Sequence, residues 1–495
     1  MQFSFPKKVL QFLECAVEEV KNVEITQELR LTDGMPDIGR VLTAWGQVML
    51  RSKQWVSGEI SLSGGVKMWV LYVPEDNTEP RVTEGWIPFQ MKWDARKTDR
   101  EGPVRMMPLL RYADGRSVSP RKLMLRAGVG VLAQGMYPME AEVYVPEELP
   151  EQVQILKSAY PVRLPVEAGE KTFLVDEDLE LEGTSMLISY TALPEITEKR
   201  ILTDKIAFKG CTNLRLVFAG YEGKIRSVNL ELPFSQLVDL DGNYGTEAQA
   251  DIRMAVTDLE ADMPEEGKLR VKCGMVAQYL VDDRQILELA EDAYCPGRAL
   301  TFETASPEFP VVVEERTEVI NPEQTLNDHN GTVVDVRYLP DHPRMRLCSD
   351  QADLELPGVF QILYYREDGT LQSATLRCED SMQLRADGNC HLAAFAQPSN
   401  QIRTSSSVDG ITFSSSLQML IRTYLDQGLT MLTSVELGEN EVRDSECPSV
   451  ILRRAEEESL WDIAKACGST VDAIRNANSG LGQGTGDRML LIPVL

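Results

Sequence analysis

Residues 210–218 have the sequence Gly-Cys-Thr-Asn-Leu-Arg-Leu-Val-Phe, an apolar run that starts at a glycine and ends on an aromatic residue. A run of this length and composition is typical of a buried strand. Two other apolar runs also end on an aromatic residue, at residues 64–72 and 356–364, and the aromatic residues that end the three runs are 146 residues apart both times. The sequence therefore predicts a β unit that is repeated along the chain.

The sequence around these runs also follows a repeated β pattern. Pro88-Phe89 recurs as Pro233-Phe234, and short apolar or alternating runs are separated by Gly, Pro, Asp and Asn. Such runs between turn-forming residues are typical of antiparallel strands. The predicted fold class is mainly β, with tandem β-rich, sandwich-like repeat domains followed by a small α+β domain.

Domain boundaries are predicted from changes in periodicity and from polar stretches. Apolar residues near the N-terminus fall at helical spacing on one face and predict an amphipathic helix. They are Val9, Leu10, Phe12, Leu13, Ala16, Val17 and Val20. The predicted parts are this helix with its lead-in (1–30), β-rich units at 31–180, 181–322 and 323–436, a linker (437–449) and a C-terminal domain (450–495).

The C-terminal domain has the signals of two capped helices between two strands. Val450-Ile451-Leu452 predicts the first strand, and residues 489–493 predict the last. Ser459 is the expected N-cap of a first helix that ends at Gly468, and a second helix is expected over 471–478. The expected order is strand, helix, helix, strand.

Four short patterns in this domain resemble the LysM family. They are Leu460-Trp461-x-Ile463-Ala464, Gly468-Ser469-Thr470-Val471, Asn476-x-Asn478 and Gly486-x-x-x-Leu490-x-Ile492-Pro493. The resemblance implies a βααβ module that binds N-acetylglucosamine glycans such as peptidoglycan. Here Glu457-Glu458-Ser459 stands where the family has Gly-Asp-Thr, and a glutamate side chain obstructs the close backbone approach that a glycine allows. We therefore expect a protein partner rather than a glycan.

The expected binding surface lies on the first loop and helix and at the end of the second helix. Its residues are Glu458, Ser459, Leu460, Trp461, Lys465, Asn478 and Ser479. Trp461 lies about 100° from the apolar face of its helix and beside Lys465 at i+4, so we expect it to be partly exposed. Two structural roles stay open: Trp461 can cap the domain's own core, and Asn478 can bond loop backbone.

A second resemblance covers the middle β unit. The segment from Arg200 to Gly242 is similar to the repeats of the DUF3794 or SPOCS family; its matching features are Arg200-Ile-Leu-Thr, Gly210, Leu214 to Phe218 and Glu231-Leu-Pro-Phe-Ser-Gln236. That family occurs with C-terminal LysM domains in SipL-like spore coat morphogenetic proteins of spore-forming Firmicutes. The resemblance implies a scaffold or adaptor in spore coat assembly, whose LysM domain docks on the ATPase of the coat's basement layer. Binding to peptidoglycan of the wall or cortex is the alternative.

Composition narrows the classes of partner and the compartment. With 50 basic and 77 acidic residues the net charge is −27, which repels nucleic acid and anionic lipid surfaces. The nine cysteines form no Cys-x-x-Cys pair and indicate reduced thiols. We find neither a signal peptide nor an apolar run of about 18 residues, so no transmembrane segment is expected. We expect a cytoplasmic protein of the mother cell, located at the forespore surface and spore coat.

The sequence offers no catalytic motif. The histidines His329, His342 and His391 lack metal-ligand spacing, and there is no P-loop or nucleophile elbow. We therefore predict no metal site, no cofactor and no catalytic residue, and expect a protein that is not an enzyme. A wall hydrolase with an unrecognised site in the β repeats is a third alternative.

Overall fold

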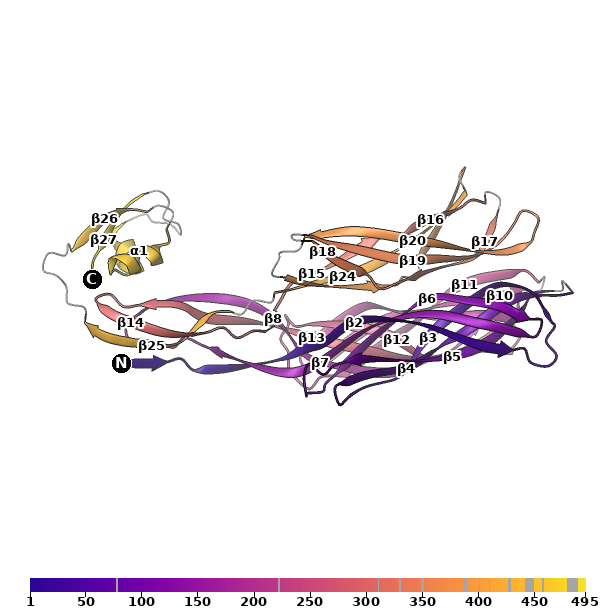
Figure 1. Ribbon diagram of the computed structural model, residues 1–495, viewed down its shortest axis with the longest axis horizontal. Coiled ribbons are helices and arrows are strands. Elements are labelled where there is room, and N and C mark those ends of the chain that lie inside the picture. The colour runs from indigo at the N-terminus through magenta and orange to yellow at the C-terminus, as the bar shows by residue number, and fades with distance from the viewer. Residues whose placement is uncertain are drawn as a thin grey trace.

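The computed structural model describes residues 1–76, 79–220, 223–309, 311–328, 331–348, 351–385, 390–399, 401–408, 410–425, 429–440, 449–455, 458–478 and 488–495. The chain is mainly β, as the sequence predicts. Figure 1 shows an elongated molecule with a broad body of packed β units, a narrower arm, and a small module beside the end of the arm. In these described ranges, no helix is both long and apolar enough to span a bilayer.

The first two units repeat one arrangement of antiparallel strands. The first contains β2 (Lys7–Arg30), β3 (Ile38–Val56), β4 (Glu59–Pro74), β5 (Arg81–Asp94), β6 (Val104–Ser119) and β7 (Lys122–Tyr144). The second contains β8 (Gln154–Glu180), β9 (Thr184–Leu202), β10 (Lys205–Gly220), β11 (Ile225–Asp239), β12 (Gln249–Glu265) and β13 (Lys268–Tyr294). Their sheets are β2–β7–β6 and β3–β4–β5 in the first unit, and β8–β13–β12 and β9–β10–β11 in the second.

The third unit is a more divided version of the same plan. It contains β15 (Val311–Ile320), β16 (Glu323–Leu326), β17 (Thr332–Pro340), β18 (Arg344–Cys348), β19 (Gln351–Tyr365), β20 (Leu371–Arg385), β21 (Cys390–Gln397), β22 (Ile402–Ser407), β23 (Gly410–Ser415) and β24 (Leu417–Leu425). Its sheets are β17–β19–β18 with β20 on β19, β15–β24–β21, and β16–β23–β22. In every unit the first long strand pairs with a late one, so each unit begins a strand earlier than the predicted ranges 31–180, 181–322 and 323–436.

The three apolar runs that suggested a repeat are the central strands β4, β10 and β19. Gly64 on β4 pairs with Phe89 on β5, and Gly210 on β10 pairs with Phe234 on β11, so the two Pro-Phe motifs occupy the same register. A Cβ added to either glycine would lie within 3 Å of the paired phenylalanine ring. The glycine and the Pro-Phe motif recur together because the ring covers the backbone that the glycine leaves bare.

Replacing Gly210 by alanine is expected to lower the free energy of unfolding by about 1–3 kcal/mol. The new methyl group would overlap the carbonyl oxygen of Glu195 on β9 and lie 2.6 Å from the ring of Phe234. Urea unfolding followed by circular dichroism measures the change. Gly245→Ala is the matched control because nothing lies within 4 Å of its added carbon; equal midpoints for the two variants would contradict the explanation.

The amphipathic helix predicted for residues 1–30 does not form. Residues 7–30 are strand β2, which pairs with β7 along its whole length. A register shift between Cys15 and Val17 changes which residues face inward. Buried side chains therefore fall at positions 10, 12, 13, 16 and 17, a spacing that imitates one face of a helix. The long-range pairing with β7 overrides this local pattern.

The three units pack around a shared cavity of about 180 Å³ in the body. It is lined by residues 46–48 of β3, 192–194 of β9 and 338–340 of β17, which follow one another at the repeat spacing of 146 residues. Strand β3 packs against β12, and β17 packs against β6. Because equivalent segments surround one cavity, the units are related by an approximate threefold axis.

Buried ion pairs join the units beside this axis. Asp335 on β17 accepts hydrogen bonds from Arg337 (2.9 Å), from Arg215 on β10 (2.5 Å) and from the Nε1 of Trp45 on β3 (3.1 Å). A second pair joins β6 to β12, with the Nη2 of Arg105 2.7 Å from the Oδ2 of Asp251. The units are therefore held together by charged groups as well as by apolar packing.

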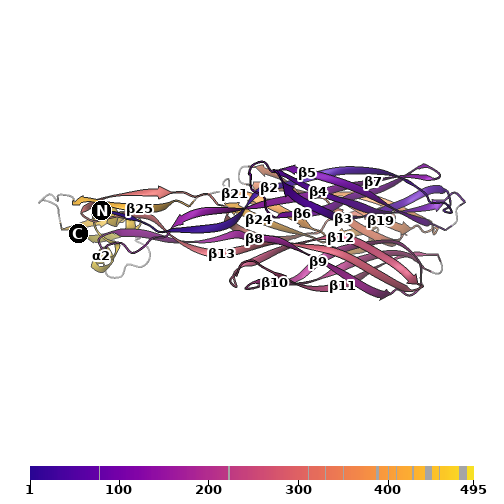
Figure 2. The same cartoon turned by 90° about the horizontal axis from the view of Figure 1, so that it is seen from below.

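The arm is built from strands that run out of the body. The paired ends of β2 with β7, and of β8 with β13, enclose an apolar core that includes Leu10, Phe12, Val143, Leu289 and Phe309. Farther out, β25 (Met431–Asn440) pairs with β1 (Gln2–Ser4) and with β14 (Arg298–Ala305). Figures 1 and 2 both place the N-terminus and the C-terminal module at the same end of this arm.

The C-terminal module follows the predicted order of elements. It consists of β26 (Val450–Arg454), α1 (Leu460–Cys467), α2 (Val471–Ala477) and β27 (Met489–Pro493). Strand β26 pairs antiparallel with β27. The predicted linker, 437–449, begins inside β25, and its residues 441–448 lie outside the described residues.

Candidate functional site

Helix α1 is bounded by a capping residue at each end, Ser459 and Gly468. Ser459 is the N-cap, and its Oγ accepts a hydrogen bond from the Asp462 backbone N–H at 3.1 Å. Gly468 closes the helix in the left-handed conformation, with a φ of 61°. With these ends fixed, Leu460, Ile463 and Ala464 face the module's core. Trp461 is partly buried and packs against the edge of this core, and Lys465 lies one turn farther along the same side of the helix.

Asn478, at the end of the second helix, has a structural role: its side-chain amide bonds to backbone groups of α2 and β27. Its Nδ2 donates to the carbonyl oxygens of Ile474 and Leu491, both at 2.7 Å, and its Oδ1 accepts from the backbone N–H of Leu491 at 2.9 Å. These bonds join the end of α2 to β27. The side chain therefore positions the module's elements and has little capacity left for a ligand.

The other residues of the predicted surface have separate environments. Leu460 is buried in the module's core. Glu458 accepts a hydrogen bond from Arg453 on β26 at 2.6 Å, and Ser459 serves as the cap. Ser479 lies outside the described residues, as do Glu457 and Gly486. Trp461 and Lys465 are the members of the set that the structure brings together at one contact.

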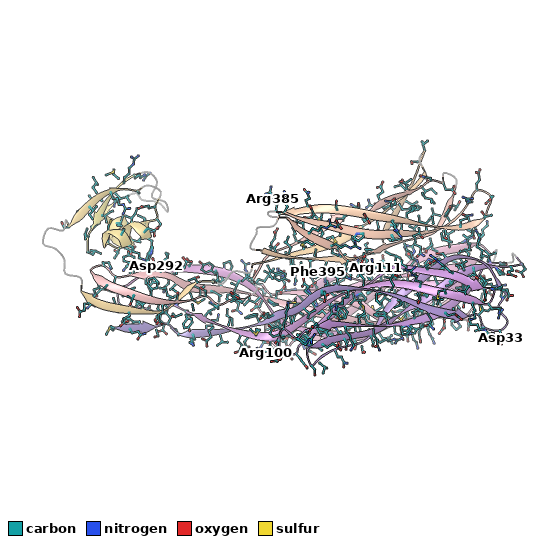
Figure 3. All side chains as sticks on the ribbon, viewed as in Figure 1. Asp33, Arg100, Arg111, Asp292, Arg385 and Phe395 are labelled. Carbon is teal, nitrogen blue, oxygen red and sulfur yellow. The ribbon has the colours of Figure 1, made fainter. Side chains whose placement is uncertain are left out.

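That contact is with the arm of the same chain, near the end of β13. The Nε1 of Trp461 donates to the Oδ2 of Asp292 at 2.8 Å, and the Nζ of Lys465 lies 2.7 Å from both carboxylate oxygens. Figure 3 labels Asp292 on the arm, beside the module. One carboxylate thus receives the polar groups of both Trp461 and Lys465.

Aromatic groups complete the contact. The ring of Tyr294 packs edge to face against Trp461, with centroids 4.8 Å apart, and Lys465 lies 6.0 Å from the ring of Phe302 on β14. Partial burial raises the pKa of Asp292, but the hydrogen bonds from Lys465 and Trp461 outweigh burial and hold it below its ordinary value. Asp292 is therefore ionised at neutral pH, as the pairing with Lys465 requires.

The module also presents an exposed apolar face. On the outer side of the β26–β27 pair, Val450, Leu452, Met489 and Leu491 are all exposed, with Leu452 65% accessible. Leu452 pairs directly with Leu491, so their side chains share this face. A contiguous apolar patch of this kind is typical of an interaction site.

Sequence reasoning missed the arm's side of the contact. Asp292, Tyr294 and Phe302 lie about 160–170 residues before the helix that they meet, and no local pattern relates the two segments. The signal available was the spacing of Asp292 and Tyr294, which places both side chains on one face of a strand. In the part of the chain that the structure describes, no group of three or more His, Cys, Asp and Glu residues is placed to hold a metal.

Comparison with known families bears on the middle unit. Residues 185–264 match the family described as SipL, SPOCS domain. This SPOCS match covers 80 of the 495 residues and nearly all of strands β9 to β12, in agreement with the predicted resemblance around Arg200 to Gly242. No curated protein and no solved structure matches the chain. The SPOCS match indicates a role connected with sporulation and the spore coat.

The SPOCS strands recur in the first unit. Strands β3 to β5 form one sheet and β6 pairs with β7, just as β9 to β11 form one sheet and β12 pairs with β13. The matched segment is therefore part of a unit that the body uses repeatedly, and it contributes residues to the buried junction around Asp335.

Proposed function

We propose that this chain is a non-enzymatic scaffold or adaptor in spore coat assembly, and that its C-terminal LysM-like module docks on a protein of the coat. The proposed partner is the ATPase of the coat's basement layer. The proposed place of action is the mother-cell cytoplasm at the forespore surface. The SPOCS match supports the link to the spore coat.

The observation that carries the docking proposal is the outer face of the β26–β27 pair. Val450, Leu452, Met489 and Leu491 expose apolar area there, at the end of an arm that holds the module away from most of the body. Burying such area on a partner is favourable by roughly 25 cal/mol per Å². A module at the end of an arm can reach a surface that the body does not touch, which suits an adaptor.

Leu452→Glu is the variant that tests this docking. Affinity purification of the full chain from sporulating cells is expected to recover the basement-layer ATPase with the wild type, and at least about tenfold less with Leu452→Glu, because a charge replaces an apolar contact. Leu174→Glu is the matched control, since Leu174 on β8 is 59% exposed and lies away from the module. Equal recovery with all three chains, or no ATPase with the wild type, would sink the proposal.

Peptidoglycan binding is the second candidate, favoured by the strand–helix–helix–strand order that the module shares with glycan-binding LysM domains. Sedimentation of the full chain with insoluble peptidoglycan distinguishes the two. The docking proposal predicts that the chain stays in the supernatant, whereas depletion that is reversed by soluble glycan fragments supports the second candidate.

A further inference from the structure

The segment of the arm that contacts α1 is placed like a bound peptide ligand. Asp292 and Tyr294 are two residues apart on extended backbone, so both side chains point toward the module. The carboxylate of Asp292 receives the indole N–H of Trp461 and the ammonium group of Lys465, while the ring of Tyr294 packs against the indole. A short acidic and aromatic strand therefore already contacts the side of α1 that carries Trp461 and Lys465.

The hydrogen-bond donors of Trp461 and Lys465 on α1 favour a ligand that carries a carboxylate. The Nε1 of Trp461 can only donate, and so can the Nζ of Lys465, so the pair calls for an acceptor that is best supplied by a carboxylate. Both groups reach the same carboxylate because they lie one turn apart on the helix. The indole ring beside them gives a flat surface for a second aromatic ring.

The contact is of a kind that can be exchanged. The side chain of Lys465 is 43% exposed, so water and salt weaken its pairing with Asp292. Within the described residues, the buried hydroxyl of Tyr294 has no hydrogen-bond partner, which lowers the affinity of this particular segment. Its occupancy is favoured because the segment belongs to the same chain and is present at high effective concentration.

We propose that Trp461 and Lys465 form a recognition site for an extended segment carrying an aspartate two residues before a tyrosine, and that residues 292–294 are its resident occupant. A protein that presents a similar segment displaces the arm and frees the module. This last step rests on the proposed docking function; the recognition itself does not.

The test uses the full chain and a fluorescein-labelled peptide spanning residues 288–296, with Ser at position 295 to avoid oxidation. Fluorescence anisotropy is expected to show binding to the Asp292→Asn chain at least about tenfold tighter than to the wild type, because the resident segment has lost its charge. Adding Lys465→Ala to Asp292→Asn is expected to reduce peptide binding about tenfold or more, and a peptide with asparagine at position 292 is expected to bind weakly.

Asp33→Asn is the matched control, because Asp33 is an exposed aspartate at the opposite end of the molecule (Figure 3). It should behave as the wild type. Hydrogen exchange of residues 460–467 reports the release of α1. Its rate is expected to rise in the Asp292→Asn chain and to stay at the wild-type value in the Asp33→Asn chain. Unchanged exchange in that variant, equal peptide binding by all chains, no peptide binding to the Asp292→Asn chain, or binding that survives Lys465→Ala would each overturn the proposal.

The recognition site and the docking function can be disproved independently of each other. If the peptide does not bind but the ATPase is still lost with Leu452→Glu, the recognition site is wrong and the docking function stands. If the peptide binds as expected but no coat protein is recovered with the wild type, the recognition site stands and the docking function is wrong.

Discussion

Replacing Asp335 by asparagine is expected to lower the free energy of unfolding by about 3–5 kcal/mol, because it leaves buried guanidinium groups without their counter-charge. Asp335 is 1% exposed and lies between Arg337 and Arg215. Burial alone would raise its pKa, but the two guanidinium groups outweigh burial and lower the pKa below the ordinary value. The carboxylate is therefore charged, and asparagine keeps its shape while removing that charge.

The effect should extend beyond one unit. Asp335 belongs to the third unit, Arg215 to the second and Trp45 to the first, so a single carboxylate connects all three. Urea unfolding followed by both circular dichroism and tryptophan fluorescence is the measurement. We expect the fluorescence change to begin at lower urea in the variant, because the junction that holds Trp45 loosens once the charge at position 335 is removed.

Asp239→Asn provides the control for charge loss in general. Asp239 is exposed and pairs with Lys205 at the surface, where water screens the interaction, so its removal should leave the unfolding midpoint unchanged. A midpoint for Asp335→Asn that equals the control would show that the buried junction does not depend on this charge.

Acidification from pH 6.5 to pH 4 is expected to destabilise the protein by about 3 kcal/mol through His342 alone. His342 lies in the third unit against Gly130 of β7, and burial lowers its pKa from 6.5 to about 4. Asp341, which pairs with Arg111 of β6 at 2.7 Å, raises the pKa but does not offset burial. At about 1.4 kcal/mol per pH unit, this difference gives the stated magnitude.

The sign follows from which state binds the proton more readily. The unfolded chain, with a histidine pKa near 6.5, takes up the proton first, so the folded state is favoured fully above pH 6.5. This stability is lost progressively as the pH falls toward 4. Below pH 4 the folded protein is protonated as well, and His342 adds no further pH dependence.

His342→Asn separates this effect from that of the carboxylates, which titrate in the same range. The variant should be less stable at pH 7 because its smaller side chain leaves space at the contact with the first unit. Its loss of stability between pH 6.5 and 4 should be about 3 kcal/mol smaller than that of the wild type, measured by urea titration at each pH. Parallel pH profiles for the two proteins would refute a buried neutral histidine.

The repeat could be predicted from sequence because its signal is local. The glycine, the apolar strand and the Pro-Phe motif are each determined by a single hairpin, as the pairing of Gly210 with Phe234 illustrates. The first strand of each unit is different, because it pairs with a strand about a hundred residues or more later. Periodicity predicts an amphipathic helix at the N-terminus for this reason: the spacing of apolar residues in 7–30 contains no information about the distant strand, β7, with which they pair.

The candidate site was predictable on one side only. The N-cap of α1, the face that it turns to the core and the side that it leaves accessible all follow from the order of Ser459, Leu460 and Trp461. What contacts the exposed face depends on how the arm folds back on the module, and that places Asp292 beside Lys465 without any sequence relation between them. A pattern within a helix indicates which face is available but does not indicate which distant segment will cover it.

The junction around Asp335 has a consequence for how such an assembly can arise. Trp45, Thr191 and Arg337 occupy equivalent positions in the three units, pairing with residues 69, 215 and 361 of the central strands. A homotrimer of one unit would carry the same side chain at all three positions, so a tryptophan, a threonine and an arginine could not occupy them together. Joining the copies in one chain lifts that restriction. Each copy can specialise, a carboxylate of one can meet a guanidinium of another, and the order of the units around the axis is fixed.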